Sequence, residues 1–248
     1  MKKNKILVAL TSLGCVALLC SFLMQEPQKK VWMIGDSTMA IKSKNKFPET
    51  GWGMAFAKLF NEKAKVVNKA RNGRSTKSCI NEGIWKSVDE GMQKGDYLFI
   101  QFGHNDEKVH KPGTGTTIDE FKANLAFFVQ ESRKKGVYPI LLTPIARRAF
   151  ESGELVDTHG AYPAAVRTVA DSLSVPLIDL TPQTMALLRS MGEEPSRKLF
   201  LQLPKGSPNY PDGVEDNTHL NEFGATSIAH LAAESLKNQH IPLAEYLK

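Results

Sequence analysis

The stretch Val31-Trp32-Met33-Ile34-Gly35-Asp36-Ser37 (VWMIGDS, residues 31–37) decides the fold of this chain. Its four apolar residues have the length of a short buried strand, and the Gly-Asp-Ser sequence that follows is typical of a tight turn. Further apolar runs that end in polar or turn-forming residues lie at 66–67, 97–100, 137–142 and 175–178. The chain therefore repeats one pattern, a short strand that stops at a polar cluster.

Segments with apolar residues at helical spacing separate these runs. They cover residues 52–60, 121–129, 162–173, 181–191 and 224–236. Strands that alternate with helices predict a parallel sheet with helices on both faces, an α/β fold in three layers. Residues 195–217 are rich in Pro, Gly, Asn and Asp, and we expect them to form a long surface loop.

Polar residues follow the predicted strands at the edge where an open parallel sheet binds ligands. In strand order these residues are Ser37, Gly73, Asn105 and the pair Arg147 and Arg148. The segment that carries Asp216 and His219 precedes the last helix and can reach the same edge. The chain order thus predicts one site built from segments that are far apart in sequence.

Ser37, His219 and Asp216 have the chemistry of a catalytic triad. A serine hydroxyl is a weak nucleophile until a base removes its proton, and histidine is the usual base near neutral pH. Asp216 lies three residues before His219, so one turn can direct its carboxylate to the imidazole Nδ1 and leave Nε2 free for Ser37. A purely structural interpretation also exists, because serine and aspartate often cap helices. The catalytic interpretation predicts acyl transfer through an acyl-enzyme.

Three groups are candidates for an oxyanion hole, which stabilises the tetrahedral intermediate of acyl transfer. They are the backbone N–H of Ser37, the backbone N–H of Gly73 and the side-chain amide of Asn105. Glycine has no side chain, so its main chain can approach a substrate closely. Gly73 and Asn105 also suit ordinary turns, and both interpretations can hold together.

Four sequence blocks resemble those of the SGNH (GDSL-type) hydrolases. The blocks are Gly35-Asp36-Ser37-Thr38, Gly73, Gly103-His104-Asn105-Asp106 and Asp216-Asn217-Thr218-His219. They stand in the family's order, and the likeness covers essentially the whole chain after its N-terminal segment. The resemblance implies the SGNH hydrolase fold, a three-layer α/β/α sandwich with a flavodoxin-like parallel sheet. It also implies a serine esterase site without a metal and without a diffusible cofactor.

Within that superfamily the sequence is similar to the rhamnogalacturonan acetylesterase group. The similar segments are residues 71–75 (RNGRS), 143–148 (TPIARR) and 224–225 (GA). Thr38-Met39 stands where a GDSL block has Ser-Leu. The resemblance implies hydrolysis of acetyl esters on pectin-type polysaccharide. The alternatives are an esterase for acetylated xylan or other glycans, a lipid esterase, and a carbohydrate-binding protein without catalysis.

Three arginines are candidate substrate-binding residues: Arg74, Arg147 and Arg148. They lie in or beside the segments that follow the predicted strands. The planar guanidinium group suits the carboxylates of uronic acids. The alternative is a solvated basic rim with no specific ligand.

Other conspicuous side chains have structural interpretations. We expect Asp36 to hold the nucleophile turn through backbone hydrogen bonds and Cys79 to pack in the core. We interpret His104 and His159 as surface or structural residues that can also line the cleft. The tryptophans are expected to pack rather than to bind sugar rings: Trp32, Trp52 and Trp85.

The N-terminus has the pattern of an export signal. Lys2, Lys3 and Lys5 precede residues 6–24, which contain no charged residue. The alternatives are a cleaved signal peptide, a retained membrane anchor and lipid attachment at Cys15. Each places the folded protein outside the cytoplasm, as a secreted, periplasmic or surface-anchored protein. We assign residues 1–25 to this segment and residues 26–248 to a single esterase domain.

The charge of the chain argues against nucleic acid as a partner. The formal net charge is +6, and it is +3 without the three N-terminal lysines, which is too small to indicate a nucleic-acid surface. The expected partner is an acetylated polysaccharide or oligosaccharide, and membrane attachment is expected only through the N-terminus. We expect a monomer.

Overall fold

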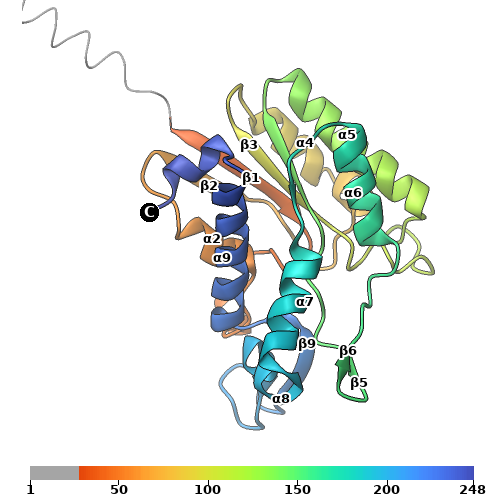
Figure 1. Cartoon of the computed structure of the whole chain (residues 1–248), viewed down its shortest axis with the longest axis vertical. Coiled ribbons are helices and arrows are strands. Elements are labelled where there is room, and N and C mark those ends of the chain that lie inside the picture. The colour runs from red at the N-terminus through yellow and green to blue at the C-terminus, as the bar shows by residue number, and fades with distance from the viewer. Residues whose placement is uncertain (1–27) are drawn as a thin grey trace, which may run out of the picture.

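The computed structural model describes residues 28–248, and its centre is a five-stranded sheet in the order β2-β1-β3-β4-β7 (Figure 1). All four ladders between neighbouring strands are parallel, as the alternation of strands and helices predicts. The strands are β1 (Lys29–Gly35), β2 (Ala64–Asn68), β3 (Tyr97–Gln101), β4 (Tyr138–Leu142) and β7 (Leu177–Ile178). The predicted export segment, residues 1–25, and its boundary with the domain lie outside the described residues.

Successive residues of β1 point to opposite faces of the sheet, as the pleat of a strand requires. Val31 and Met33 pack in one buried cluster, and Trp32 and Ile34 pack in the other. Both sets are buried, so β1 is apolar throughout rather than alternating with polar residues. This is typical of a parallel strand that is covered on both faces.

Helices cover both faces of the sheet, and the predicted three-layer α/β/α fold is confirmed (Figure 1). The first cluster contains residues from three helices: α2 (Trp52–Ala57), α7 (Leu180–Met191) and α9 (Glu222–Asn238). The second cluster contains residues from four helices: α3 (Thr76–Asn81), α4 (Ile84–Gly91), α5 (Ile118–Lys134) and α6 (Tyr162–Ser172). No helix in residues 28–248 is long and apolar enough to cross a membrane.

The prediction of a long loop at residues 195–217 is wrong. This segment contains the end of α8 (Glu193–Ser196), a 3₁₀ turn (Arg197–Leu199) and the antiparallel strands β8 (Phe200–Leu203) and β9 (Val214–Leu220). The Pro, Gly, Asn and Asp residues that indicated a loop lie mainly between the two strands, where they connect a hairpin. Figure 1 shows this hairpin at the carboxyl ends of the central strands.

Smaller elements complete the described chain. They are the 3₁₀ turns Lys44–Lys46 and Pro242–Tyr246 and the short strands β5 (Phe150–Glu151) and β6 (Glu154–Leu155). The helices α3 and α4 were not predicted from the sequence. Cys79 and the three tryptophans are buried, as expected.

Candidate active site

Ser37, His219 and Asp216 form one hydrogen-bonded chain at the carboxyl ends of the strands. His219 Nε2 lies 2.9 Å from Ser37 Oγ, and His219 Nδ1 lies 2.6 Å from Asp216 Oδ2. With the Nδ1 proton directed at the carboxylate, the Nε2 lone pair faces the serine hydroxyl. The sequence predicted this grouping, and the structure brings the three side chains together.

An irregularity in strand β9 places Asp216 and His219 on the same site. Leu201 pairs with Asp216, whereas Phe200 pairs with Leu220, so the intervening residues bulge out of the β8–β9 ladder. The bulge turns the backbone within three residues. A bulge in a strand, rather than the predicted turn in a loop, therefore directs the Asp216 carboxylate at the His219 ring.

The carboxylate of Asp216 holds this bulge and stays ionised. Its Oδ1 accepts hydrogen bonds from the backbone N–H groups of Thr218, at 2.7 Å, and His219, at 2.8 Å. Burial alone would raise the pKa of Asp216, but these bonds and the bond from the His219 ring lower it to about 2. The second oxygen is left as a negatively charged acceptor for the imidazole.

Asp36 fixes the turn that carries Ser37. The Asp36 side chain is fully buried, and its Oδ1 accepts hydrogen bonds from the Thr38 backbone N–H, at 2.9 Å, and the Thr38 hydroxyl, at 2.8 Å. Its other oxygen lies 3.2 Å from His104 Nδ1. This is the structural role that the sequence predicts for Asp36.

His104 is buried rather than on the surface, and it faces the same cavity as Ser37. Burial is the largest influence on the pKa of His104 and lowers it, although Asp36 acts in the opposite direction. The ring is therefore neutral and donates its Nδ1–H to Asp36. Its Nε2 is then an acceptor, and it has no hydrogen-bond partner in residues 28–248.

Glu107 joins Arg147, which lines the cavity, to the buried His159. Arg147 Nη2 pairs with Glu107 Oε1, and His159 Nδ1 lies 2.9 Å from Glu107 Oε2. Burial raises the pKa of Glu107, but His159 and Arg147 together lower it below its usual value. The His159 ring packs edge-on against His104, with the ring centres 4.5 Å apart. Sequence reasoning missed Glu107, because nothing in its neighbourhood along the chain points to these partners.

The three candidate oxyanion donors have free N–H groups. Neither the Ser37 nor the Gly73 backbone N–H donates a hydrogen bond to another described residue. Asn105 Nδ2 donates to the Arg74 carbonyl at 3.0 Å, and Asn105 Oδ1 accepts from Lys108 Nζ at 2.8 Å. These two bonds orient the amide, and its second N–H remains available to the cavity that Asn105 lines.

The backbone conformation explains the glycine at position 73. Gly73 has a φ of +76°, and a Cβ built at this position would meet nothing within 4 Å. The left-handed conformation, rather than a close contact, therefore requires glycine here.

A buried ion pair supports the loop that carries Gly73. Lys42 Nζ lies 2.6 Å from Glu49 and donates a hydrogen bond to the Asn72 side chain at 2.8 Å.

Asp106 ties the turn after β3 to helix α3. Its Oδ1 accepts hydrogen bonds from the Thr76 N–H, at 3.0 Å, the Thr76 hydroxyl, at 2.6 Å, and the Thr116 hydroxyl, at 3.2 Å. Burial outweighs these bonds and raises the pKa of Asp106 to about 7. Its Oδ2 has no partner among the described residues.

The structure separates the three candidate arginines. Arg147 lines the cavity with Ser37. The Arg74 guanidinium instead binds Glu82 Oε2, at 2.9 and 2.7 Å. Arg148 is 6% exposed, and it donates to the Glu193 carbonyl and the Asn217 side chain. Other residues of the chain bind both of these guanidinium groups, and neither Arg74 nor Arg148 lines the cavity, so a role of these two arginines in substrate binding stays a prediction.

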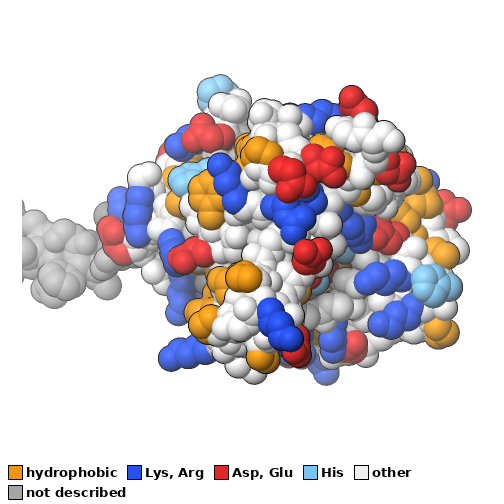
Figure 2. Space-filling model, turned by 90° about the horizontal axis from the view of Figure 1, so that it is seen from below, with side chains coloured by type: hydrophobic (Ala, Val, Ile, Leu, Met, Phe, Trp, Pro, Cys, Tyr) orange, Lys and Arg blue, Asp and Glu red, His pale blue; other side chains and the backbone are white. Residues whose placement is uncertain are grey.

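A cavity of about 260 Å³ joins these groups and can hold a small acyl group. The residues that line it are Ser37, His104, Asn105, Lys108, Arg147, Asp216, Thr218 and His219. Figure 2 shows this end of the molecule, where basic and acidic side chains are intermixed over the surface. No group of three or more His, Cys, Asp or Glu residues in the described part of the chain could hold a metal ion. The arrangement is suited to nucleophilic attack by a serine on an ester.

Comparison with known proteins finds one matching family model and two relatives that align with most of this chain. Residues 33–226 match the model of the GDSL-like lipase/acylhydrolase family. A rhamnogalacturonan acetylesterase of Bacillus subtilis, RhgT, is 41% identical over 220 residues, which are 88% of this chain and 94% of the relative. A probable rhamnogalacturonan acetylesterase of the same organism, YesY, is 31% identical and is covered to 95%.

A solved structure has the same fold. The crystal structure of YxiM from Bacillus subtilis superposes with a TM-score of 0.74 and 27% sequence identity, over 86% of this chain. The chain spans 57% of that protein's length.

Proposed function

The chain belongs to the GDSL-like lipase/acylhydrolase family, and we propose that it hydrolyses acetyl esters on pectin-type polysaccharide through an acyl-enzyme on Ser37. The observation that carries the proposal is the hydrogen-bonded chain from Ser37 through His219 to Asp216, with contacts of 2.9 and 2.6 Å. It supplies a nucleophile, a base and an orienting carboxylate in the geometry of serine esterases.

In the first half of the reaction Ser37 Oγ attacks the acetyl carbonyl while His219 Nε2 takes the hydroxyl proton. The carbonyl oxygen becomes an oxyanion, which accepts hydrogen bonds from the Ser37 and Gly73 N–H groups and the Asn105 amide. The tetrahedral intermediate then collapses, and His219 returns its proton to the sugar oxygen as the C–O bond breaks. The products are acetyl-Ser37 and a free sugar hydroxyl.

In the second half His219 takes a proton from water, and the hydroxide attacks the acetyl carbonyl. The same three donors hold the second oxyanion, and the proton passes from His219 to Ser37 Oγ as acetate leaves. Asp216 stabilises the imidazolium in both halves. Asp216 is not protonated during the cycle, which agrees with its low pKa.

The relatives support pectin as the substrate more directly than xylan. Two relatives that align with nearly the whole described chain are named rhamnogalacturonan acetylesterases. Arg147 lines the cavity, and its guanidinium, which also pairs with Glu107, suits an acidic polymer better than a lipid.

We also propose that the chain is exported and that residues 26–248 act as one domain and as a monomer. The N-terminal lysines and the uncharged run after them support export.

Acetate release from polymers tests the substrate. Purified protein is incubated with acetylated rhamnogalacturonan, acetylated xylan and a short-chain lipid ester at equal ester concentration. The proposal expects acetate release chiefly from the pectin polymer, and none with a Ser37→Ala variant. Preferential release from xylan or hydrolysis of the lipid would overturn the substrate, and full activity of Ser37→Ala would overturn the mechanism.

A further inference from the structure

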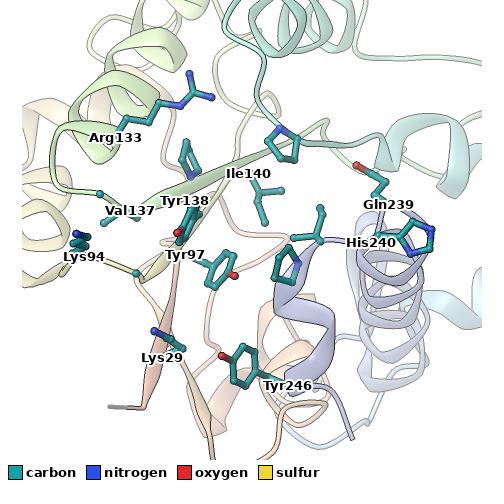
Figure 3. A pocket seen from close by; sticks show the side chains of 16 residues that line it. Lys29, Lys94, Tyr97, Arg133, Val137, Tyr138, Ile140, Gln239, His240 and Tyr246 are labelled. Atoms are coloured by element: carbon teal, nitrogen blue, oxygen red, sulfur yellow. The ribbon is translucent and has the colours of Figure 1, made fainter. Parts of the chain in front are cut away.

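A second cavity, of about 840 Å³, lies at the amino ends of the strands, opposite the candidate active site (Figure 3). Lys29, Tyr97 and Tyr138, which begin β1, β3 and β4, contribute to its wall. Residues of the 3₁₀ turn Pro242–Tyr246 complete it. The two cavities share no residue, and the proposed mechanism uses nothing in this one.

Tyrosine rings form part of the apolar wall of the cavity, together with aliphatic side chains such as Ile140 and Ile241. The rings of Tyr97 and Tyr138 lie 5.2 Å apart with an angle of 33° between their planes, and Tyr138 is 58% exposed. Figure 3 shows these rings and Tyr246 between the lysines on one side and the segment of Gln239 and His240 on the other. Burial, with help from the neighbouring tyrosines, raises the pKa of Tyr97 to about 12. The Tyr97 hydroxyl is therefore protonated and can donate a hydrogen bond.

The charged groups of the cavity are all basic. Lys29, Lys94 and Arg133 line it, and its lining contains no Asp or Glu. None of the three forms a salt bridge within residues 28–248. Arg133 donates to two backbone carbonyls, which do not neutralise its charge. Glu245 lies near enough to influence Tyr97, but it is exposed and does not line the cavity.

Two glycines leave room for the lysine side chains. A Cβ on Gly95 would lie 3.2 Å from Lys29 Nζ, and a Cβ on Gly136 would lie 2.9 Å from Lys94 Cγ. The two glycine segments are joined, because the Gly95 N–H donates to the Gly136 carbonyl at 2.9 Å. This backbone hydrogen bond fixes the two glycine segments against each other beside Lys94.

We propose that this cavity is a second carbohydrate-binding site, which holds a uronate-containing stretch of the polysaccharide. The lysines pair with uronate carboxylates, and the exposed tyrosine face packs against a sugar ring. The identity of the polymer rests on the proposed function. Because the two sites lie at opposite ends of the strands, the second site keeps the enzyme on the polymer while Ser37 acts on another stretch or a neighbouring chain.

Binding of polygalacturonate, which carries uronates but no acetyl groups, tests the proposal. Calorimetric titration compares wild type with Lys29→Gln/Lys94→Gln and Tyr138→Ala, each checked for an unchanged melting temperature. We expect about tenfold weaker binding in each variant, and weaker binding of wild type as salt rises. Lys86→Gln/Lys122→Gln removes the same charge outside the cavity and is expected to bind like wild type. Neutral xylan is expected to bind more weakly than polygalacturonate.

Equal affinity of Lys29→Gln/Lys94→Gln and wild type would overturn the proposal. So would equal binding of xylan, or preferential binding of anionic phospholipid vesicles over polygalacturonate. Hydrolysis of p-nitrophenyl acetate is measured in parallel and is expected to be the same in both lysine variants and wild type. A protein that binds polygalacturonate through this cavity but releases no acetate from pectin would refute the proposed function and leave the second site standing.

Discussion

His104 donates its Nδ1–H to the carboxylate of Asp36 across 3.2 Å, beside the turn that carries Ser37. Both side chains are buried, so this bond stabilises the nucleophile turn in a medium where an unpaired carboxylate is costly. The same ring lines the cavity, and its Nε2 has no hydrogen-bond partner among residues 28–248. One residue thus links the support of the nucleophile to the substrate side of the site.

Substitution of His104 tests this link. His104→Leu removes the donor to Asp36, and a lost hydrogen bond to a buried charge destabilises by about 1.5–3 kcal/mol. We expect a lower melting temperature and a lower kcat. His104→Asn keeps a donor near the position of Nδ1 and is expected to recover stability more than activity, because it lacks Nε2. Equal stability of the Leu and Asn variants would contradict the assignment.

Asn105 provides the second prediction. Asn105→Ala removes one oxyanion donor, and we expect kcat for p-nitrophenyl acetate to fall by about 10²–10³ with a smaller change in KM. Lys108→Ala is the matched control, because Lys108 contacts Asn105 Oδ1 but supplies no predicted oxyanion donor. A loss in Lys108→Ala as large as that in Asn105→Ala would assign the effect to the orientation of the loop.

The raised pKa of Asp106 predicts that the stability of the protein depends on pH. Burial raises its pKa from 3.8 to about 7, so the folded protein binds this proton more tightly than the unfolded chain. The resulting stabilisation is fully present below about pH 4 and is lost as the pH rises through about 7. Asp106→Asn keeps the Oδ1 acceptor and cannot titrate, so its melting temperature is expected to fall less between pH 5 and pH 8 than that of wild type. Parallel pH profiles for the two proteins would refute the role of Asp106.

Substitutions of the adjacent residues Arg147 and Arg148 are expected to have different effects. Arg147 lines the cavity, so Arg147→Ala is expected to lower kcat/KM for acetylated pectin about tenfold, and more than for p-nitrophenyl acetate. Arg148 binds Glu193 and Asn217 in the interior, so Arg148→Ala is expected to lower the melting temperature. Thermal unfolding and kinetics on both substrates separate the two outcomes. The reverse pattern would show that the assignments are exchanged.

The sequence predicts the fold well because the strands are short apolar runs with clear ends. It also predicts which residues meet, since the carboxyl ends of parallel strands share one edge. It fails at residues 200–220, where the turn-forming residues that connect strands β8 and β9 dominate the composition. The bulge that aims Asp216 at His219 depends on pairing with β8, which no local pattern reveals.

Side-chain partners that are distant in sequence could not be predicted either. The contacts of Glu107 with Arg147 and His159 span 40 and 52 residues. The same limit explains why the sequence predicts Arg74 and Arg148 as substrate-binding residues, since both follow strands and the sequence does not show their partners. Only the folded structure shows that Glu82, Glu193 and Asn217 already occupy their guanidinium groups.

The central claim is that Ser37 is the nucleophile and that His219 activates it. Labelling with a fluorophosphonate probe, followed by mass spectrometry of the digested protein, tests it most directly. The account predicts one adduct, on the peptide that contains Ser37, and a strong loss of labelling in His219→Ala, with its fold verified by circular dichroism. An adduct on another residue, or labelling of Ser37 at the wild-type rate without His219, would contradict it.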